Sequence, residues 1–441
     1  MLNIDISAQL INQTKRVFAQ HNIRLDQPLW LAFSGGCDST CLLHILCQLT
    51  DPRNIHVIHI NHQLSPHADQ WEQHCQQVAS SLGTTFHYTR VTTLVGCHTD
   101  IEARARAERY NAFSALLPHE ATLVQGHHAD DQAETTLMRL LRGSGPDGLA
   151  GIPISGWHDH FLIFRPLLGI RRAELQQYAQ IHNLTWIEDE SNHNTCFTRN
   201  YIRHEILPRL EKKWPAAAKN IARSAQHCVE QNALTQCILQ TKVAAIIEAK
   251  RVHIPSLLKE PIHTQKFIIR HWQKSWSPYP LSSKQLAMLF SSVLGARTDR
   301  EPNMAHDGFI IRRYREYLYA IPKEQIILPQ TPITWAPSEP SLLIPNLGVT
   351  LTRHATRDDS LYQQPLTIRF RQGGERFHPV GRQASHPVKK LFQSWAIPPW
   401  ERAYIPLVYA GKTLIAIPGY GLSAHPQAQG SITIAPTADL L

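Results

Sequence analysis

The sequence predicts an α/β fold: a parallel twisted sheet with helices on both faces, followed by a helical domain and a small α+β C-terminal domain. Three observations lead to this prediction. Short apolar runs alternate with helical patterns in the first half of the chain, which is typical of a parallel sheet covered by helices. Long helical patterns follow, and the last segment shows short strands and turns. A chain of 441 residues is also too long for one ordinary core, since domains contain roughly 100 to 200 residues each.

The first half contains four strand-and-helix units. Each consists of an apolar run followed by a helical pattern: 30–33 with 38–49, 55–60 with 68–82, 86–91 with 100–117, and 122–125 with 129–141. In a parallel sheet the ligand binds at the carboxyl ends of the strands, where the connecting loops converge. We therefore expect functional residues directly after these apolar runs, in segments 34–39, 61–62 and 126–134.

The rest of the chain divides by pattern. Long helical segments such as 216–250 and 265–276 follow Trp214, and six prolines from Pro322 to Pro345 indicate a linker with short extended pieces. We predict three domains: a catalytic domain at 1–213, a helical second domain with the proline-rich linker at 214–345, and a small C-terminal domain at 346–441.

Composition limits the class of protein. The chain has 44 lysine and arginine residues against 35 aspartate and glutamate residues, a formal net charge of +9, which suits a polyanionic partner but does not prove one. The eight cysteines include no CxxC pair and no zinc-site spacing, so we expect free thiols in a reducing compartment. No stretch approaches the ~20 apolar residues of a membrane helix, and residues 1–20 lack the apolar core of a signal peptide. We expect a cytoplasmic protein with no membrane partner.

The segment after the first apolar run has the composition of a phosphate-binding loop. Its residues are Ser34, Gly35, Gly36, Cys37, Asp38 and Ser39. Glycines let the backbone wrap around an anion, and backbone N–H groups, the positive end of the next helix and two serine hydroxyls supply donors. A carboxylate repels phosphate, so a metal ion between Asp38 and the phosphates is the simplest explanation for that residue.

The pattern SGGxDS is not a Walker A loop, because no lysine or GK[ST] follows the glycines, and we do not expect transfer of a γ-phosphoryl group. It resembles the PP-loop of the ATP pyrophosphatases. This resemblance implies a Rossmann-like domain that splits ATP between the α and β phosphates and leaves an adenylylated substrate. The alternative is a serine-capped glycine turn that binds nothing, and the strand before it and the helix after it weigh against that alternative.

A second polar group follows the fourth apolar run. Asp131 and Glu134 are three residues apart and can share one face of a helix that begins just after His127. Carboxylates near a helix N-terminus can stabilise the helix without any catalytic role. Two adjacent histidines add no such stability, because the helix dipole repels them when they are charged. We favour a functional interpretation, in which Asp131 with Asp38 holds magnesium on the ATP phosphates and His127 assists the charge that develops on an activated base.

This group, with the segment 140–145 after it, resembles the second motif of the tRNA(Ile)-lysidine synthetases, a family of PP-loop enzymes. The resemblance makes Asp38, His127 and Asp131 the catalytic candidates. It implies Asp38 and Asp131 as metal ligands and residues 34–39 as the ATP-binding loop.

Three arginines are second-tier candidates for contacts with phosphate or tRNA. Arg106 and Arg109 lie one turn apart in a helical run that also contains Glu102. Such a run is commonly a solvated salt-bridge face, and the alternative is that an arginine fork binds the nucleotide or a tRNA phosphate. The run resembles a third segment of the same family. Arg203 lies further along the chain, in one of several segments that follow each other in the same order as in that family. It would either tie a loop to a helix or close the nucleotide pocket.

The segment 369–402 is far more basic than the chain average. It contains Arg369, Arg371, Arg376, Arg382, Lys389, Lys390 and Arg402 against Glu375 and Glu401. A phosphate backbone is the natural partner. Four interleaved aromatic residues could stack on bases, but such residues more often form a core: they are Phe377, Phe392, Trp395 and Trp400. The segment resembles the C-terminal domain of the long lysidine synthetases, which implies that Lys389 and Lys390 help to dock tRNA.

Over nearly the whole chain, the resemblance implies a ligase that forms a C–N bond. It would join free L-lysine to C2 of the wobble cytidine in the CAU anticodon of tRNA(Ile), through an adenylylated tRNA and with release of pyrophosphate and AMP. Decoding would change from AUG to AUA. ATP is then a substrate, Mg²⁺ a cofactor and a homodimer a further expectation.

Two other functions stay open. A PP-loop tRNA thiolase would activate the base in the same way and deliver sulfur. Such enzymes commonly carry a paired-cysteine motif, whereas the closest spacing here is Cys37 to Cys41. A tRNA-binding protein with a vestigial ATP site is the alternative of a different class, and the presence of Asp38, His127 and Asp131 argues against it.

Overall fold

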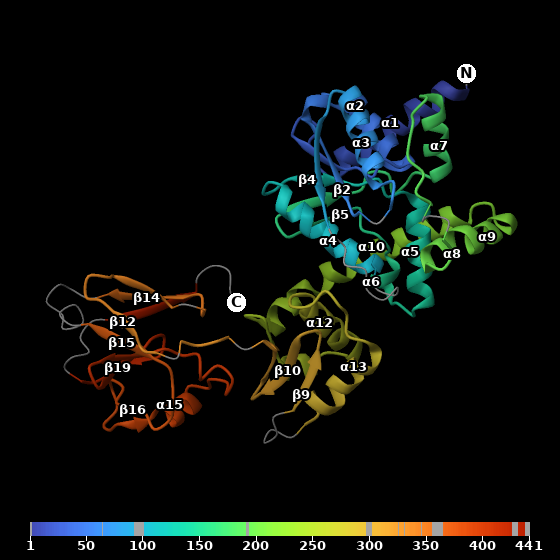
Figure 1. Cartoon of the computed structure of the whole chain (residues 1–441). Helices are drawn as coiled ribbons and strands as arrows, with labels where there is room; N and C mark the ends of the chain where they lie inside the picture. Colours follow the sequence, from blue (N-terminus) through green and yellow to red (C-terminus); the bar gives the residue numbers. More distant parts are fainter. Residues whose placement is uncertain are drawn as a thin grey trace. The chain divides into compact units, whose positions relative to one another are not determined.

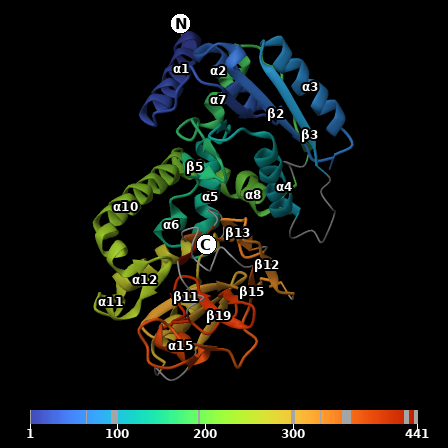
Figure 2. The ribbon, with the colours of Figure 1, turned by 90° about the vertical axis from the view of Figure 1, so that its left-hand side faces the viewer.

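The computed structural model describes residues 2–63, 65–91, 101–190, 194–296, 302–324, 326–329, 331–344, 346–354, 365–425 and 431–436. The chain forms two compact units, Met1–Ile238 and Leu239–Leu441. The boundary between them falls inside α10 (Ala217–Ile246), which Figure 2 shows as one long helix.

The first unit is drawn mainly in blue to green in Figure 1. It is built on a six-stranded sheet in the order β3-β2-β1-β4-β6-β5. The strands are β1 (Leu29–Ala32), β2 (Ile55–Asn61), β3 (Thr85–Arg90), β4 (Thr122–Val124), β5 (Ser155–His158) and β6 (Phe161–Phe164). Neighbouring strands pair in parallel, except that β5 runs antiparallel to β6. The predicted parallel sheet is confirmed, and the described ends of the four predicted strand-and-helix units agree with the structure to within one residue.

Helices cover both faces of this sheet. The described helices before α10 are α1 (Leu2–Gln20), α2 (Cys37–Leu49), η1 (Pro52–Asn54), α3 (Ala68–Ser81), α4 (Ile101–Leu116), α5 (Ala129–Leu141), α6 (Pro146–Leu149), α7 (Arg172–Ile181), α8 (Thr198–Tyr201), the π-helical turn η3 (Ile202–Ile206) and α9 (Leu207–Lys213). One core joins α1, α2, α3 and α7 to Val124 and its neighbours, and another joins α4 to Leu123. Because side chains of a strand alternate between faces, adjacent residues of β4 lie in different cores.

The order of the strands defines where a ligand would bind. The chain moves outward from β1 to β2 and β3 and then returns to β4 on the other side of β1. A crevice forms at such a reversal, outside the carboxyl ends of the strands. The loops after β1 and β4 are the two segments that the sequence analysis singled out.

The second unit begins with a mixed region around a five-stranded antiparallel sheet, ordered β7-β8-β11-β10-β9. Its elements are β7 (Ile247–Glu248), β8 (Arg251–His253), α11 (Ile254–Leu258), α12 (Ile262–Lys274), α13 (Ser283–Met288), the π-helical turn η4 (Leu289–Leu294), β9 (Asn303–His306), β10 (Phe309–Tyr314) and β11 (Tyr317–Pro322). The sequence analysis predicted the helices but not this sheet. The predicted helix 216–250 ends at Ile246, because Ala249 and Lys250 adopt positive φ angles of 44° and 64° in the turn between β7 and β8.

The remainder of this unit is the predicted small α+β region. Its strands are β12 (Ile333–Trp335), β13 (Ser341–Ile344), β14 (Val349–His354), β15 (Leu366–Arg369), β16 (Arg376–Phe377), β17 (His386–Pro387), β18 (Leu407–Ala410), β19 (Thr413–Ile417), β20 (Gly421–Leu422) and β21 (Ser431–Pro436), with helix α15 (Val388–Ser394). They form a five-stranded, a three-stranded and a two-stranded sheet. Within the described part of the chain, no helix is both long and apolar enough to cross a bilayer.

Candidate active site

The segment 34–39 after β1 requires glycine at position 35. Gly35 has a φ angle of +79°, which residues with a side chain rarely adopt. A Cβ atom at Gly35 would lie 2.6 Å from Ile187 Cδ1 and 2.8 Å from Cys75 Sγ. The close packing of Ile187 also includes a backbone bond, in which its N–H donates to the Gly35 carbonyl at 2.8 Å.

Replacement of Gly35 by alanine is expected to destabilise the first unit by about 2–5 kcal/mol, since the left-handed backbone contributes about 1–2 kcal/mol and the overpacking about 1–3 kcal/mol. Urea denaturation and ATP affinity measure the effect. Gly143→Ala is the matched control: Gly143 also has a positive φ, 71°, but a Cβ there meets nothing within 4 Å. Equal losses in the two variants would show that the packing around Gly35 contributes nothing.

The same loop offers hydrogen-bond donors to an anion. The N-cap residue of α2 is Gly36, which has no side chain to cap the first N–H groups of the helix. The hydroxyls of Ser34 and Ser39 lie 3.1 Å apart, and the Ser39 hydroxyl donates to the Gly36 carbonyl at 3.0 Å. Exposed N–H groups at the positive end of a helix, next to hydroxyls, form a site for phosphate.

Asp38 faces this loop from the first turn of α2. Its side chain is 30% exposed, and its Oδ1 atom is buried without a hydrogen-bond partner among the described residues. The other oxygen, Oδ2, lies 3.5 Å from His128 Nε2. A Cβ on Gly126 would lie 3.3 Å from the Asp38 carbonyl group, so the loop after β4 packs directly against the start of α2.

His128, which the sequence analysis did not select, is central to this contact. It is the N-cap residue of α5 and forms a capping box with Asp131, whose Oδ2 accepts the His128 N–H at 3.0 Å. Its Nε2 lies 3.4 Å from Asp131 Oδ2 as well as close to Asp38. Burial opposes a charge on His128, yet Asp131 and Asp38 raise its pKa above the ordinary value. The capping position before the acidic first turn was the sequence signal that could have found it.

His127, the predicted catalytic histidine, is in a different electrostatic environment. Burial lowers its pKa to about 3; Asp131 opposes this shift, while Arg165 and Arg199 add to it. Its Nδ1 atom is buried and has no hydrogen-bond partner among the described residues. His127 is therefore neutral near pH 7 and has a ring nitrogen available to a ligand.

Asp131 and Glu134 bind two arginines. Arg199 Nη2 and Arg203 Nη2 lie 2.8 and 3.0 Å from Asp131 Oδ1. The Nε atoms of the same arginines lie 2.8 and 2.6 Å from the two Glu134 oxygens. Although burial opposes ionisation, His128 and Arg199 hold the pKa of Asp131 well below its usual range. Arg203 thus ties η3 to α5, and Glu134 and Arg199 are part of a cluster that the sequence analysis did not assemble.

A neighbouring ion-pair network fixes the start of α5. Arg171 donates to both oxygens of Asp130, at 2.9–3.1 Å, and its Nη2 donates to Glu211 at 2.7 Å. The backbone N–H of Arg172 donates to Asp130 at 2.8 Å. Helices α5, α7 and α9 are therefore joined beside the loop that carries the two histidines.

The two arginines predicted on α4 have separate environments. Arg106 lies over the Tyr110 ring at 5.1 Å, and its Nη2 lies 3.5 Å from the Tyr110 hydroxyl. It is near enough to lower the pKa of His127. Arg109 Nε lies 3.4 Å from His62 Nε2, at the end of β2. Arg106 faces the histidine site, whereas Arg109 contacts the loop after β2.

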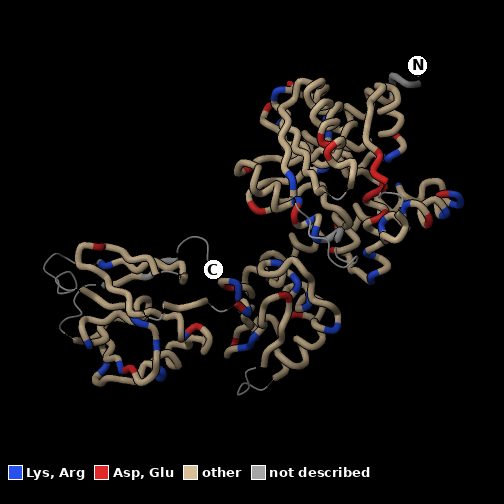
Figure 3. Tube along the Cα trace, in the orientation of Figure 1, with Lys and Arg blue, Asp and Glu red and all other residues tan. Residues whose placement is uncertain are grey.

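Figure 3 marks the lysines and arginines along the described part of the second unit. Lys389 and Lys390 are exposed on α15. Phe377 and Phe392 are buried in the core beneath that helix, as the core interpretation predicted. Trp395 stacks on Tyr420 at 5.3 Å, and Trp400 packs edge-on against Tyr314 and Tyr319.

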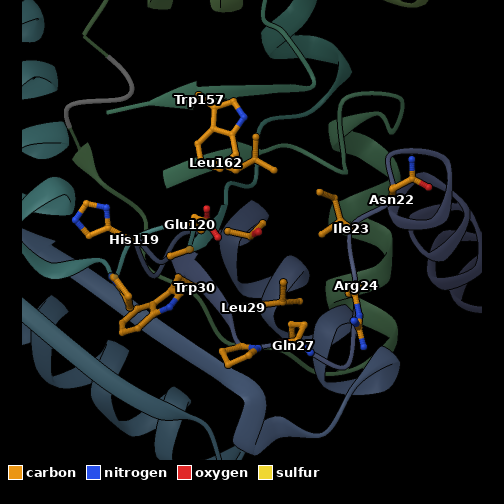
Figure 4. A pocket seen from close by; sticks show the side chains of 14 residues that line it. Asn22, Ile23, Arg24, Gln27, Leu29, Trp30, His119, Glu120, Trp157 and Leu162 are labelled. Carbon is orange, nitrogen blue, oxygen red and sulfur yellow. The ribbon is translucent and has the colours of Figure 1, made fainter. Parts of the chain in front are cut away.

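A cavity of about 570 Å³ lies elsewhere in the first unit. It is lined by residues that include Trp30, Glu120 and Trp157 (Figure 4). These residues lie at the amino ends of β1 and β4 and on β5. The cavity is therefore at the opposite end of the sheet from the loop, and no predicted site residue lines it.

Three family models match the chain. A PP-loop domain model matches residues 6–210, a TilS substrate binding domain model matches residues 253–319, and a TilS substrate C-terminal domain model matches residues 366–434. Each match lies inside one of the three predicted domains.

The chain is also similar to curated tRNA(Ile)-lysidine synthases. It is 36% identical to that of Coxiella burnetii over 405 residues, which cover 91% of this chain and 90% of the relative. It is 37% identical to that of Serratia proteamaculans over 435 residues, 96% of both chains. Among solved structures, a U34-tRNA thiolase from Methanococcus maripaludis is 18% identical with a TM-score of 0.41, over 51% of this chain and 80% of that chain. The chain therefore belongs to the tRNA(Ile)-lysidine synthase family of enzymes, with a PP-loop domain in its first unit.

Proposed function

We propose that this protein joins free L-lysine to C2 of the wobble cytidine in a CAU-anticodon tRNA(Ile), using ATP and releasing pyrophosphate and AMP. The main observation in support is that a phosphate loop and two histidines meet at the carboxyl ends of β1 and β4, where Asp38 Oδ2 lies 3.5 Å from His128 Nε2. Membership of the family supplies the substrate class. The product base would pair with A in place of G, which changes decoding from AUG to AUA.

The first step forms an adenylylated tRNA. The O2 atom of cytosine attacks the α-phosphorus of ATP, the bond between that phosphorus and the bridging oxygen breaks, and pyrophosphate leaves. The N–H groups at the start of α2 and the Ser34 and Ser39 hydroxyls hold the phosphates, and arginine side chains near His127 offset developing negative charge. His127 is neutral, so it can hydrogen-bond to the base without adding another positive charge.

Magnesium is part of this proposal, and Asp38 fits it best. Its Oδ1, which has no hydrogen-bond partner among the described residues, suits a hard cation that also binds phosphate oxygens. Asp131 fits less well, because Oδ1 contacts two arginines and Oδ2 accepts the His128 N–H. When bound, the ion would stabilise charge on the departing pyrophosphate.

The second step displaces AMP. The lysine amine attacks C2 of the adenylylated base, the C2–O bond breaks, and AMP leaves with its oxygen while the amine loses a proton. Adenylylation is what turns a poor oxygen leaving group into a good one. The reaction is proposed for the cytoplasm, and the expected homodimer can be checked by light scattering.

The test is pyrophosphate release from ATP with unmodified CAU-anticodon tRNA(Ile), with and without radiolabelled lysine. Label on the tRNA, together with AMP and pyrophosphate, is the expected result. Binding without label would favour a thiolase if a sulfur donor restored turnover, or a binding module if it did not.

Reversal of two charges on α15 is expected to weaken tRNA binding. Lys389→Glu with Lys390→Glu should reduce the slope of log affinity against log salt by about 1.4 to 1.8, since each phosphate contact contributes about 0.7 to 0.9. Filter binding over a salt series measures the slope. The control reverses Lys212 and Lys213, an exposed adjacent pair at the end of α9. An unchanged slope, or the same change in the control, would place the specific contact elsewhere.

A further inference from the structure

Two buried polar side chains at the carboxyl ends of β4 and β6 have atoms without partners. Gln125 is 6% exposed and Arg165 is 4% exposed. Gln125 Oε1 and Arg165 Nε are both buried, and neither has a hydrogen-bond partner in the described part of the chain. Buried polar atoms are rarely left unpaired in native proteins, so these two atoms indicate a missing partner.

The two side chains lie next to each other. Strands β4 and β6 are parallel, with Val124 opposite Phe164, and the N–H of Gln125 donates to the Phe164 carbonyl at 2.9 Å. Gln125 and Arg165 are the next residues on each strand. They point to the face of the sheet that α4 covers, because Leu123 and Ile163, two residues earlier, belong to the core of that face.

Each side chain is held by its other polar atoms. The Nε2 atom of Gln125 donates to the Tyr110 hydroxyl at 3.4 Å, which leaves Oε1 available. Arg165 Nη1 donates to the Pro153 carbonyl at 2.8 Å, and its guanidinium group also interacts with the Tyr110 side chain, while Nε has no partner among the described residues. The acceptor and the donor therefore come from neighbouring positions on two paired strands.

Gln125 directly follows β4 and lies two residues before His127, and the surroundings of the pair are positive. The guanidinium groups of Arg165 and Arg106 are both close enough to His127 to act on it. Arg106 also lies over the Tyr110 ring, whose hydroxyl contacts Gln125. A ligand of this pair would therefore lie beside the histidine that we place at the reacting base.

We propose that Gln125 and Arg165 recognise the wobble base as cytosine. Gln125 Oε1 would accept from the exocyclic amino group, and Arg165 Nε would donate to N3, which leaves O2 free to attack ATP. Uracil has the opposite pattern, with an acceptor at position 4 and a donor at position 3, so both contacts would fail. Unstacked bases of single-stranded RNA are commonly recognised through this edge. The inference rests on the proposed function, because it assumes that a base is activated at this site.

The test is a cycle that combines one protein change with one base change. Wild type and Gln125→Met are compared on tRNA with cytosine at the wobble position and on tRNA with pyrimidin-2-one there, which lacks only the amino group. Each single change should lower kcat/KM for tRNA-dependent pyrophosphate release about tenfold. The two together should lower it no further than one alone, because they remove the same hydrogen bond. Additive losses would overturn the proposal and would favour an ordered water molecule, in place of the base, as the hydrogen-bond partner of Gln125 Oε1.

Control experiments distinguish loss of the base contact from a folding defect and from failure of the proposed reaction. Gln13→Met, on a half-buried side chain that donates to the Gly169 carbonyl, should respond to the base change as wild type does. If Gln125→Met does not fold, Arg165→Lys on tRNA with 3-deazacytosine gives the equivalent cycle for N3. If wild type releases no pyrophosphate with cytosine tRNA, the proposed function fails. Binding measured with a non-hydrolysable ATP analogue then tests the base contacts alone, and equal affinity for the two tRNAs would overturn them.

Discussion

Replacement of Asp38 by alanine is expected to abolish pyrophosphate release, with a fall of at least about 10³-fold, while tRNA binding stays largely intact. The loss follows from removing the carboxylate whose Oδ1 is free to hold magnesium on the phosphates, since such a metal contributes several kcal/mol of charge stabilisation. Binding should survive because the basic residues of α15 belong to the other unit.

The measurement is a single-turnover assay of pyrophosphate release beside filter binding of tRNA. Asp26→Ala is the matched control, because Asp26 is an exposed aspartate of the same unit that pairs only with Arg24 among the described residues. Equal loss of turnover and of tRNA binding in Asp38→Ala would contradict the division of labour between the two units.

Replacement of Glu134 by alanine is expected to destabilise the first unit by about 3–5 kcal/mol. Glu134 is 1% exposed and pairs with both Arg199 and Arg203, so its removal leaves two largely buried guanidinium groups with an incomplete set of partners. Such a loss is a large part of a typical folding free energy of about 5–15 kcal/mol. Urea denaturation followed by circular dichroism measures it.

Glu205→Ala provides the comparison for that experiment. Glu205 forms an ion pair with Arg209 one helical turn away, and both side chains are exposed. An exposed pair contributes about 0–1 kcal/mol. If Glu134→Ala were no more damaging than Glu205→Ala, the buried cluster would not be what holds η3 against α5.

Local sequence patterns were enough to predict the part of the fold that positions the site. Apolar runs and the helical patterns after them located β1 to β4 and α2 to α5, because each of these elements has one buried face that its own residues determine. The hairpin β5–β6 was not predicted, since β5 is polar and partly exposed and no apolar run marks it. The turn at Ala249 and Lys250 was missed for another reason: these residues rarely take a left-handed conformation, so nothing in their identity indicated it.

Pairing at the site could not be predicted from local pattern. Asp38 and the phosphate loop follow from the residues of one segment. The contacts of Glu134 with Arg199 and Arg203 join positions 65 and 69 residues apart in the chain, and only the fold brings them together. The capping box of His128 with Asp131 was a local signal that was not used, whereas the contact of His128 with Asp38 depends on the fold.

The strand order also affects how the protein folds while it is being made. Strand β1 pairs with β2 early, but its other edge pairs only with β4. The ribosome must therefore extend the chain from Asn61 to Val124 before that edge is covered, which takes several seconds at about 5–20 residues per second. During this interval one edge of β1, which will lie in the middle of the finished sheet, has no strand beside it. Nascent chains are then most exposed to wrong pairing with one another. Pausing of translation after β3 should increase aggregation, whereas a pause after β6 should not.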